Sequence, residues 1–63
     1  MAITLKAARV NAGLTQSAAA KLLNISKTTL ANYENYKTTP DMDTGNKIAK
    51  LYGLSVDQII FFK

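Results

Sequence analysis

The chain has 63 residues, and its eight basic residues outnumber four acidic ones, which gives a formal net charge of +4. It contains neither cysteine nor histidine, so a disulfide framework, a thiolate metal site and the commonest acid–base catalyst are excluded. A chain of this length forms one domain at most, and we assign residues 1–63 to it. Because clustered carboxylates are also absent, we expect no enzyme, no cofactor, no bound metal and no small-molecule substrate.

The apolar residues form no long continuous run. Lys6, Arg9, Asn11 and Gln16 interrupt the first 20 residues, which therefore lack the apolar core of a signal peptide. No run approaches the ~20 residues that a membrane span needs. We therefore expect a cytoplasmic protein that does not interact with a membrane.

The positive charge is unevenly distributed along the chain. Residues 1–40 hold five basic residues against Glu34 alone, whereas residues 41–63 hold three residues of each sign. Such a surplus attracts an acidic partner, nucleic acid above all, although solubility alone also accounts for it. Charge by itself leaves these two interpretations open.

The first 24 residues contain the signals of two short helices. Thr4 is placed to cap the first helix, and Gly13 ends it. Thr15 is placed to cap the second helix, which covers the sequence QSAAAKLL at residues 16–23. Asn24 follows, and asparagine tolerates the left-handed backbone conformation that is common where helices end.

A third helix is expected over residues 27–35, with Ser26 as its cap. The sequence NYKTTPD after it indicates a loop, because Pro40 has no backbone donor and pushes the preceding residue out of helical geometry.

Two more helices are expected in the last third of the chain. Asp41 is placed to cap a helix that Gly53 ends, and Ser55 with Gln58 has the form of a capping box for a last helix at residues 56–62. No stretch alternates apolar and polar residues over strand length, so we expect no sheet. The predicted fold is all-α, a compact orthogonal bundle of five helices that are too short for an up-and-down arrangement.

Residues 16–35 combine two of these helices with a tight turn. Ala19 and Ala20 are small enough for the two helix backbones to approach closely, and Asn24 can adopt the conformation that the turn needs. This is the pattern of a DNA-binding helix-turn-helix, in which the second helix enters the major groove. The inward apolar anchors of this block are Leu23, Ile25, Leu30 and Tyr33.

On these residues the chain resembles the Cro/C1-type (Xre-like) helix-turn-helix family of phage and bacterial repressors. The resemblance runs without gaps from about Leu5 to Ile60. It implies a five-helix bundle of the lambda-repressor-like type and a transcriptional regulator that binds operator half-sites in double-stranded DNA as a dimer. The matching stretches are GLTQ at 13–16, AAKLLNIS at 19–26, YEN at 33–35, KTTPD at 37–41 and KIAKLYGLSVDQII at 47–60.

The resemblance assigns base reading to Lys27, Thr28 and Asn32 on the third helix. Lysine can donate to guanine O6 and N7, asparagine can pair with adenine N6 and N7, and a threonine methyl can meet the thymine methyl. The alternative for each residue is that it contacts only phosphate or solvent.

Contacts with DNA phosphates are implied for five further residues. In the family, a glutamine at the position of Gln16 commonly binds a DNA phosphate and often braces the recognition helix. A helix N-terminus is also an anion site in general. Two more of these residues, Ser26 and Asn35, flank the recognition helix, and Ser26 also serves as its cap. The last two, Lys37 and Thr38, follow in the loop. The charge of Lys37 would make binding sensitive to salt.

Arg9 and Glu34 occupy positions that this family commonly joins in a structural salt bridge. Glu34 is the only acidic residue among the first 40, and an unpaired acid beside DNA would be repelled. We therefore expect Arg9 to neutralise it.

Several residues depart from the family's usual pattern, and two of them raise questions about the fold. Tyr36 stands where glycine often ends the recognition helix, so either the tyrosine is strained or the helix ends differently. Gly45 stands in mid-helix where a large apolar residue is usual, and Met42, Phe61 and Phe62 are candidates to fill the space. The other two departures are Ala18 and Ala19.

The apolar C-terminus predicts an interface. Two consecutive phenylalanines on one short helix cannot both point inward, and exposed apolar surface often marks a contact with another molecule. We expect a homodimer through Ile60, Phe61 and Phe62, which would place two recognition helices about 34 Å apart, one turn of DNA. A protein-interaction module with the same fold, such as an antitoxin-like domain, is the competing hypothesis.

Overall fold

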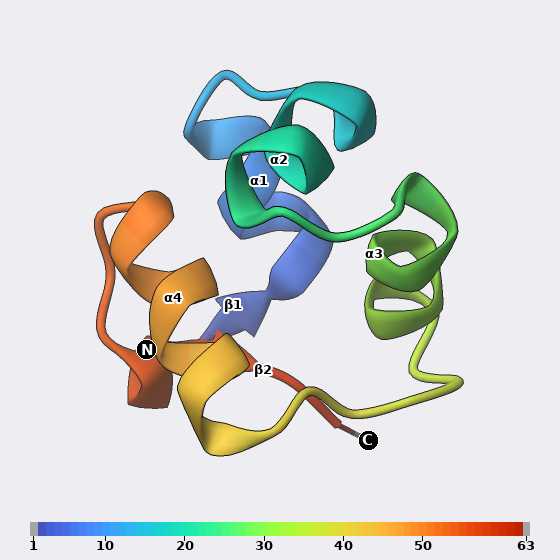
Figure 1. Ribbon diagram of the computed structural model, residues 1–63. Coiled ribbons are helices and arrows are strands. Elements are labelled where there is room, and N and C mark those ends of the chain that lie inside the picture. Colours follow the sequence, from blue (N-terminus) through green and yellow to red (C-terminus); the bar gives the residue numbers. More distant parts are fainter. Residues whose placement is uncertain (1, 63) are drawn as a thin grey trace.

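The computed structural model describes residues 2–62, which fold into a small helical domain of about 27 × 23 × 19 Å (Figure 1). Within this part of the chain there are four α-helices, one short 3-10 helix and two very short strands. In chain order they are β1 (Ile3–Thr4), α1 (Leu5–Asn11), α2 (Gln16–Leu23), α3 (Lys27–Glu34), α4 (Met42–Leu51), η1 (Val56–Gln58) and β2 (Ile59–Ile60).

Each α-helix begins at the capping residue that the sequence predicts. A side-chain oxygen of each cap accepts a hydrogen bond from the backbone N–H three residues later, at 2.8–3.1 Å. Such a bond satisfies one of the donors that a helix leaves free at its N-terminus. The four pairs are Thr4 with Ala7, Thr15 with Ala18, Ser26 with Thr29 and Asp41 with Thr44.

The four α-helices also end alike, each with one residue in the left-handed conformation. These residues are Gly13, Asn24, Tyr36 and Gly53, with φ between 58° and 76°. In each case the next residue donates its backbone N–H to the carbonyl five residues back, which is the Schellman arrangement. The donors are Leu14, Ile25, Lys37 and Leu54, and the acceptors are Arg9, Ala20, Asn32 and Ala49.

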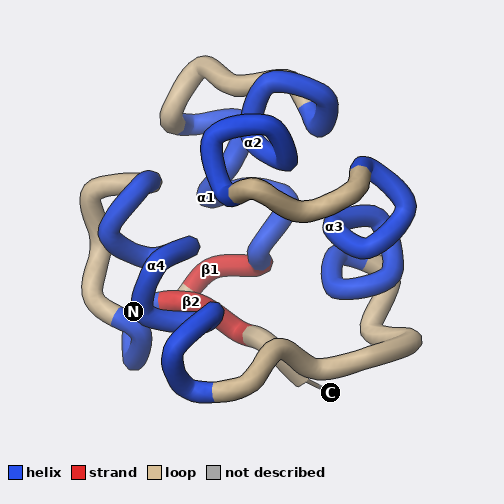
Figure 2. The backbone as a smooth tube through the Cα atoms, viewed as in Figure 1, coloured by secondary structure: helices blue, strands red, loops and turns tan. Residues whose placement is uncertain are grey.

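The last segment differs from the prediction. The expected fifth helix at residues 56–62 is only the 3-10 turn Val56–Gln58, although the predicted capping box between Ser55 and Gln58 is present. The chain then becomes extended, and β2 pairs in parallel with β1, with Ile3 opposite Ile59 (Figure 2). The five-helix bundle and the absence of a sheet were therefore wrong. Two consecutive isoleucines favour extended backbone, and the pairing partner lies at the other end of the chain.

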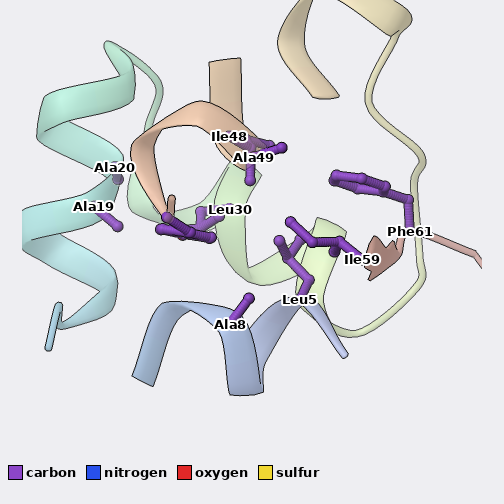
Figure 3. Close-up of a cluster of buried hydrophobic side chains, with 10 residues drawn as sticks. Leu5, Ala8, Ala19, Ala20, Leu30, Ile48, Ala49, Ile59 and Phe61 are labelled. Atoms are coloured by element: carbon purple, nitrogen blue, oxygen red, sulfur yellow. The ribbon is translucent and has the colours of Figure 1, made fainter. Parts of the chain in front are cut away.

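A single apolar core lies between the helices and the strand pair (Figure 3). Leu30 of α3, Ile48 of α4 and Ala19 of α2 are each 0% exposed, so these three helices meet at the centre. The small side chains of Ala19 and Ala20 let α2 lie close to its neighbours. The remaining core residues are Leu5, Ala8, Ala49, Tyr52, Ile59 and Phe61.

The C-terminal phenylalanines have different surroundings. Phe61 is one of the three candidates for filling the space beside Gly45, and it is buried there. Val56 also lies next to Gly45. Met42 and Phe62, the other two candidates, are 72% and 71% exposed and do not fill it. One phenylalanine is thus buried and the other exposed, as expected, and a dimer contact through this segment would use Ile60 and Phe62 rather than the buried ring of Phe61.

Candidate nucleic-acid interface

Helix α3 buries one face and leaves the other accessible. Leu30 and Glu34 are one turn apart and are both buried. Thr28 and Asn32 are one turn apart on the side turned away from Leu30, and they are exposed and partly exposed. Lys27 is exposed at the first position of the helix, one turn before Leu30. The three predicted base-reading residues are thus all accessible, with Thr28 and Asn32 on one face and Lys27 beside them at the N-terminal end, while Leu30 anchors the helix in the core.

The predicted ion pair between α1 and α3 is present. Arg9 donates from Nε to Glu34 Oε2 at 2.7 Å and from Nη2 to Oε1 at 3.3 Å. The side chains are only 9% and 2% exposed. A guanidinium and a carboxylate joined by two bonds form a strongly directional contact. The only acidic residue of the first 40 is therefore neutralised inside the domain and does not oppose an anionic ligand.

Gln16 completes this cluster from the start of α2. Its Nε2 donates to Glu34 Oε1 at 2.9 Å, so both carboxylate oxygens are engaged by the two partners. The amide of Gln16 is half-buried, and it braces the C-terminal end of α3. The amide nitrogen of Gln16 carries a second N–H, and the predicted contact with a DNA phosphate would use that donor.

One further bond in the cluster has no signal in the sequence. Arg9 Nη1 donates to the backbone carbonyl of Leu14 at 2.8 Å, which ties the turn between α1 and α2 to the same arginine. Every residue carries a carbonyl, so no side-chain pattern signals this acceptor.

The N-terminal end of α3 is held by Ser26, whose hydroxyl already has two partners. Its Oγ accepts from the backbone N–H of Thr29 at 3.0 Å and lies 2.8 Å from Thr29 Oγ1. The hydroxyl of Ser26 therefore has a structural role as the helix cap, as the sequence predicts. Ser26 remains exposed beside Lys27, at the edge of the polar surface.

Tyr36 occupies the left-handed position at the C-terminal end of α3. The residue has φ of 61°, so the helix ends in the usual geometry and the tyrosine carries its conformational cost. Asn35, Lys37 and Thr38 are exposed around this turn. The backbone N–H groups of Lys37 and Thr38 both point to the carbonyl of Asn32, at 2.9 and 3.5 Å. The ammonium of Lys37 is then the group on this loop best suited to an anion.

The predicted site residues fall into two separate groups. The predicted base-reading and phosphate-binding residues lie on α3, on the residues that flank it and at the start of α2. Ile60 and Phe62 lie instead on the C-terminal segment after η1, with exposed fractions of 37% and 71%. Figure 1 shows this segment running under the loop between α3 and α4.

Residues 2–62 lack the features of two other kinds of protein. This part of the chain has no cluster of three or more acidic residues, cysteines or histidines that could hold a metal ion. Nor does any helix described in it have the length and apolar character needed to cross a membrane.

Comparison with known proteins places the chain among relatives. Residues 5–59 match the family model described as Helix-turn-helix. The chain is 46% identical over 56 residues to the HTH-type transcriptional regulator ImmR of Bacillus subtilis (strain 168). That alignment covers 89% of this chain and 44% of the relative, so the chain spans less than half the relative's length. No solved structure gives a significant match.

Proposed function

Because the chain belongs to the helix-turn-helix family, in its Cro/C1-type branch, we propose that it is a sequence-specific DNA-binding regulator that represses transcription as a dimer. The observation that carries this proposal is the two-sided helix α3. Its buried side is fixed by Leu30 and by the bonded carboxylate of Glu34, and its other side presents polar side chains. A reading helix needs this combination, because base contacts discriminate only when the helix position is fixed.

Lys27, Thr28 and Asn32 are the residues proposed to read bases. Lys27 and Thr28 occupy the first turn of α3, the end that a recognition helix directs toward the base edges. Asn32 lies one turn further on, where its amide can form a bidentate pair with adenine. Each good bidentate pair contributes about 1–3 kcal/mol of discrimination against the wrong base.

The proposed phosphate contacts surround this reading surface. Asn35, Lys37 and Thr38 lie exposed at the exit of α3, and Ser26 lies exposed at its start. Gln16 at the start of α2 adds an amide next to a helix N-terminus. Such contacts set the register of the protein on the duplex without reading sequence.

The dimer and the repressor role rest on simpler arguments. Ile60 and Phe62 leave apolar surface exposed at the C-terminal segment, which favours association of two copies. Repression by occupation of an operator requires nothing beyond tight binding to that site. A regulator of this kind acts where the DNA is, which for a bacterial or phage protein is the cytoplasm.

Selection of bound sequences from a random DNA pool tests the proposal. The wild-type protein should enrich a defined motif, and Asn32→Ala should lose preference at one or two positions of it. Asn46→Ala, an exposed asparagine on α4, is the matched control and should enrich the wild-type motif. Salt-sensitive binding without any enriched motif would contradict sequence-specific recognition by the wild type.

A protein-interaction module is the second candidate, favoured by the exposed side chains of Met42 and Phe62. In that case Lys27→Ala would leave binding of the partner protein unchanged, while Phe62→Ala would abolish it. The selection above separates the candidates, because an interaction module enriches no motif.

A further inference from the structure

A groove of about 430 Å³ lies between the C-terminal end of α2 and the last turns of α4. We call it the α2–α4 groove. Its volume falls within the about 300–1,000 Å³ that binding sites usually have. Helix α3 contributes no residue to it, so the groove is separate from the proposed DNA-reading surface. Its lining residues are Leu22, Leu23, Asn24, Lys47, Lys50 and Leu51.

Three leucines supply the apolar part of the groove. Leu23 and Leu51 are half-buried and pack against the core, whereas Leu22 is 64% exposed. A single exposed leucine is ordinary on the surface of a soluble domain. Leu22, however, lies in a hollow together with two further leucines, and such a concave apolar surface can receive an apolar side chain of another molecule.

Two lysines of α4 supply the charge of the groove. Lys47 and Lys50 are both exposed, and they share one side of the helix with Leu51 because these residues lie three and four positions apart. Neither ammonium forms an ion pair with any of residues 2–62. No acidic residue lines the groove, since Asp43, one turn before Lys47, lies outside it. Like charges this close on a helix repel each other, so an anion bound here would relieve their repulsion.

We propose that the α2–α4 groove binds an acidic amphipathic helix of a partner protein. Apolar side chains of that helix lie against the three leucines, and its carboxylates lie beside Lys47 and Lys50. A groove between two helices commonly receives a third helix in this way, through apolar residues at helical spacing. The long stems of the lysines can line the apolar surface while their ammonium groups reach the carboxylates. Asn24 adds an amide that can donate to the partner or accept from it.

The lining favours this occupant over DNA and over a second copy of the chain. DNA phosphates would use the two lysines, but they would leave the apolar surface of the leucines without a partner. Two copies that met groove to groove would bring the lysines of both chains together, and juxtaposed like charges oppose binding. An acidic amphipathic helix satisfies both the leucines and the lysines.

The inference goes beyond the proposed function and does not depend on it. The groove shares no residue with α3 or with the loop after it, so an acidic helix and DNA could be bound at the same time. Figure 1 shows α3 and α4 on different sides of α2. The partner would then be held at the DNA site by the regulator.

Titration of the whole chain with a synthetic peptide tests the proposal. The probe is an amphipathic helical peptide of about 15 residues, with leucines along one face and glutamates on both sides of that face. In NMR spectra of the isotope-labelled protein, the amide signals of the groove residues should shift on addition of the peptide, and those of α3 should not. Two control peptides carry lysines in place of the glutamates or alanines in place of the leucines, and both should bind at least about tenfold more weakly.

Variants of the protein test the leucine and lysine contacts separately. Leu22→Ala should weaken binding of the acidic peptide about tenfold, because it removes the most exposed apolar side chain of the groove. Met42→Ala removes an equally exposed apolar side chain outside the groove and is the control. Lys50→Glu should also weaken binding, whereas Lys6→Glu, with the same change of charge on α1, should have little effect. Circular dichroism verifies that each variant keeps its helical fold.

Exchange of the charges provides the sharpest criterion. The double variant Lys47→Glu with Lys50→Glu should bind the lysine-containing peptide more tightly than the wild type does, because the complementary pairs are restored in reverse. No measurable binding of the acidic peptide, equal binding of the acidic and lysine-containing peptides, or signal shifts centred on α3 would each overturn the proposal.

Two further measurements exclude the other occupants. Saturating duplex DNA should leave the affinity for the acidic peptide unchanged, and displacement of the peptide by DNA would assign the lysines to DNA binding instead. Sedimentation equilibrium should show the same self-association for Leu22→Ala as for the wild type, and a loss of self-association would assign the groove to a second copy. Because the peptide titration contains no DNA, its failure leaves sequence-specific DNA binding standing, and failure of DNA recognition leaves the groove inference standing.

Discussion

Gln16 and Glu34 are joined by a hydrogen bond of 2.9 Å, so the first residue of α2 holds the last residue of α3. Arg9 engages the same carboxylate from α1 at 2.7 Å. Three helices therefore share one buried acidic group, and the angle between the two helices of the helix-turn-helix depends on it. The polar surface of α3 keeps its orientation only while this carboxylate keeps its partners.

Removal of that carboxylate should unfold much of the protein. Glu34→Ala leaves the guanidinium of Arg9 buried without its partner, which typically costs about 3–5 kcal/mol. A domain of this size has a total stability on the order of 3–5 kcal/mol, so the variant should be largely unfolded at room temperature. Urea denaturation followed by circular dichroism measures the loss. Asp43→Ala, an exposed acid in the first turn of α4, is the control and should cost a few tenths of a kcal/mol.

The left-handed residue at the end of α3 predicts a difference between two substitutions. Tyr36→Gly and Tyr36→Ala both remove the ring, but only alanine keeps a Cβ at φ of 61°. The glycine variant should therefore be more stable by about 1 kcal/mol. Gly13→Ala provides a reference, because a Cβ there meets nothing within 4 Å and only the backbone cost remains. Equal stability of the two Tyr36 variants would show that the turn rearranges.

Tyr52 predicts a loss of stability at alkaline pH. Burial, assisted by the negative charge of Glu34, raises the pKa of its phenol from 10.0 to about 12. The folded state therefore favours the neutral phenol, so its contribution to stability is complete below about pH 10 and is lost as the pH rises toward 12. Tyr52→Phe should flatten the alkaline decline of the unfolding free energy relative to wild type.

The same substitution should do no harm at neutral pH. The hydroxyl of Tyr52 is buried without a hydrogen-bond partner among the residues that the structure describes. An unsatisfied buried hydroxyl costs free energy, so Tyr52→Phe should be as stable as wild type or more stable. A clear destabilisation at neutral pH would mean that the hydroxyl has a partner, such as an ordered water.

Lys37 should contribute to affinity through charge alone. Lys37→Ala should weaken binding to all DNA sequences about equally and reduce the slope of log K against log salt by about 0.9. Fluorescence anisotropy across a salt series measures this slope. Lys50→Ala on α4 removes the same charge and should leave the slope unchanged. A change in base preference with Lys37→Ala would assign this residue to base reading instead.

The features that could be predicted from the sequence are local ones. A threonine, serine or aspartate cap acts within three residues, so Thr4, Thr15, Ser26 and Asp41 mark their helices unambiguously. The left-handed conformation of Asn24 follows from its side chain in the same way. The division of α3 into a buried and a polar face is also local, since it follows from the helical period.

The features that could not be predicted depend on distant residues. Ile59 becomes extended because Ile3 offers it a partner, and neither segment alone shows a strand pattern. The burial of Phe61 follows from the same pairing together with the space over Gly45. At the site, the bond from Arg9 to the carbonyl of Leu14 required the folded turn.

The pairing of Ile3 with Ile59 also bears on the order of folding. It closes a loop of nearly the whole chain, so its entropic cost is the highest of any contact in the domain. We expect β1 and β2 to join last, after the helices have collapsed on Leu30. Phe61 and Phe62 follow β2 directly, so the burial of Phe61 is completed only with that final step. Any contact that uses the C-terminal segment would then be available only to chains whose helical core has already formed.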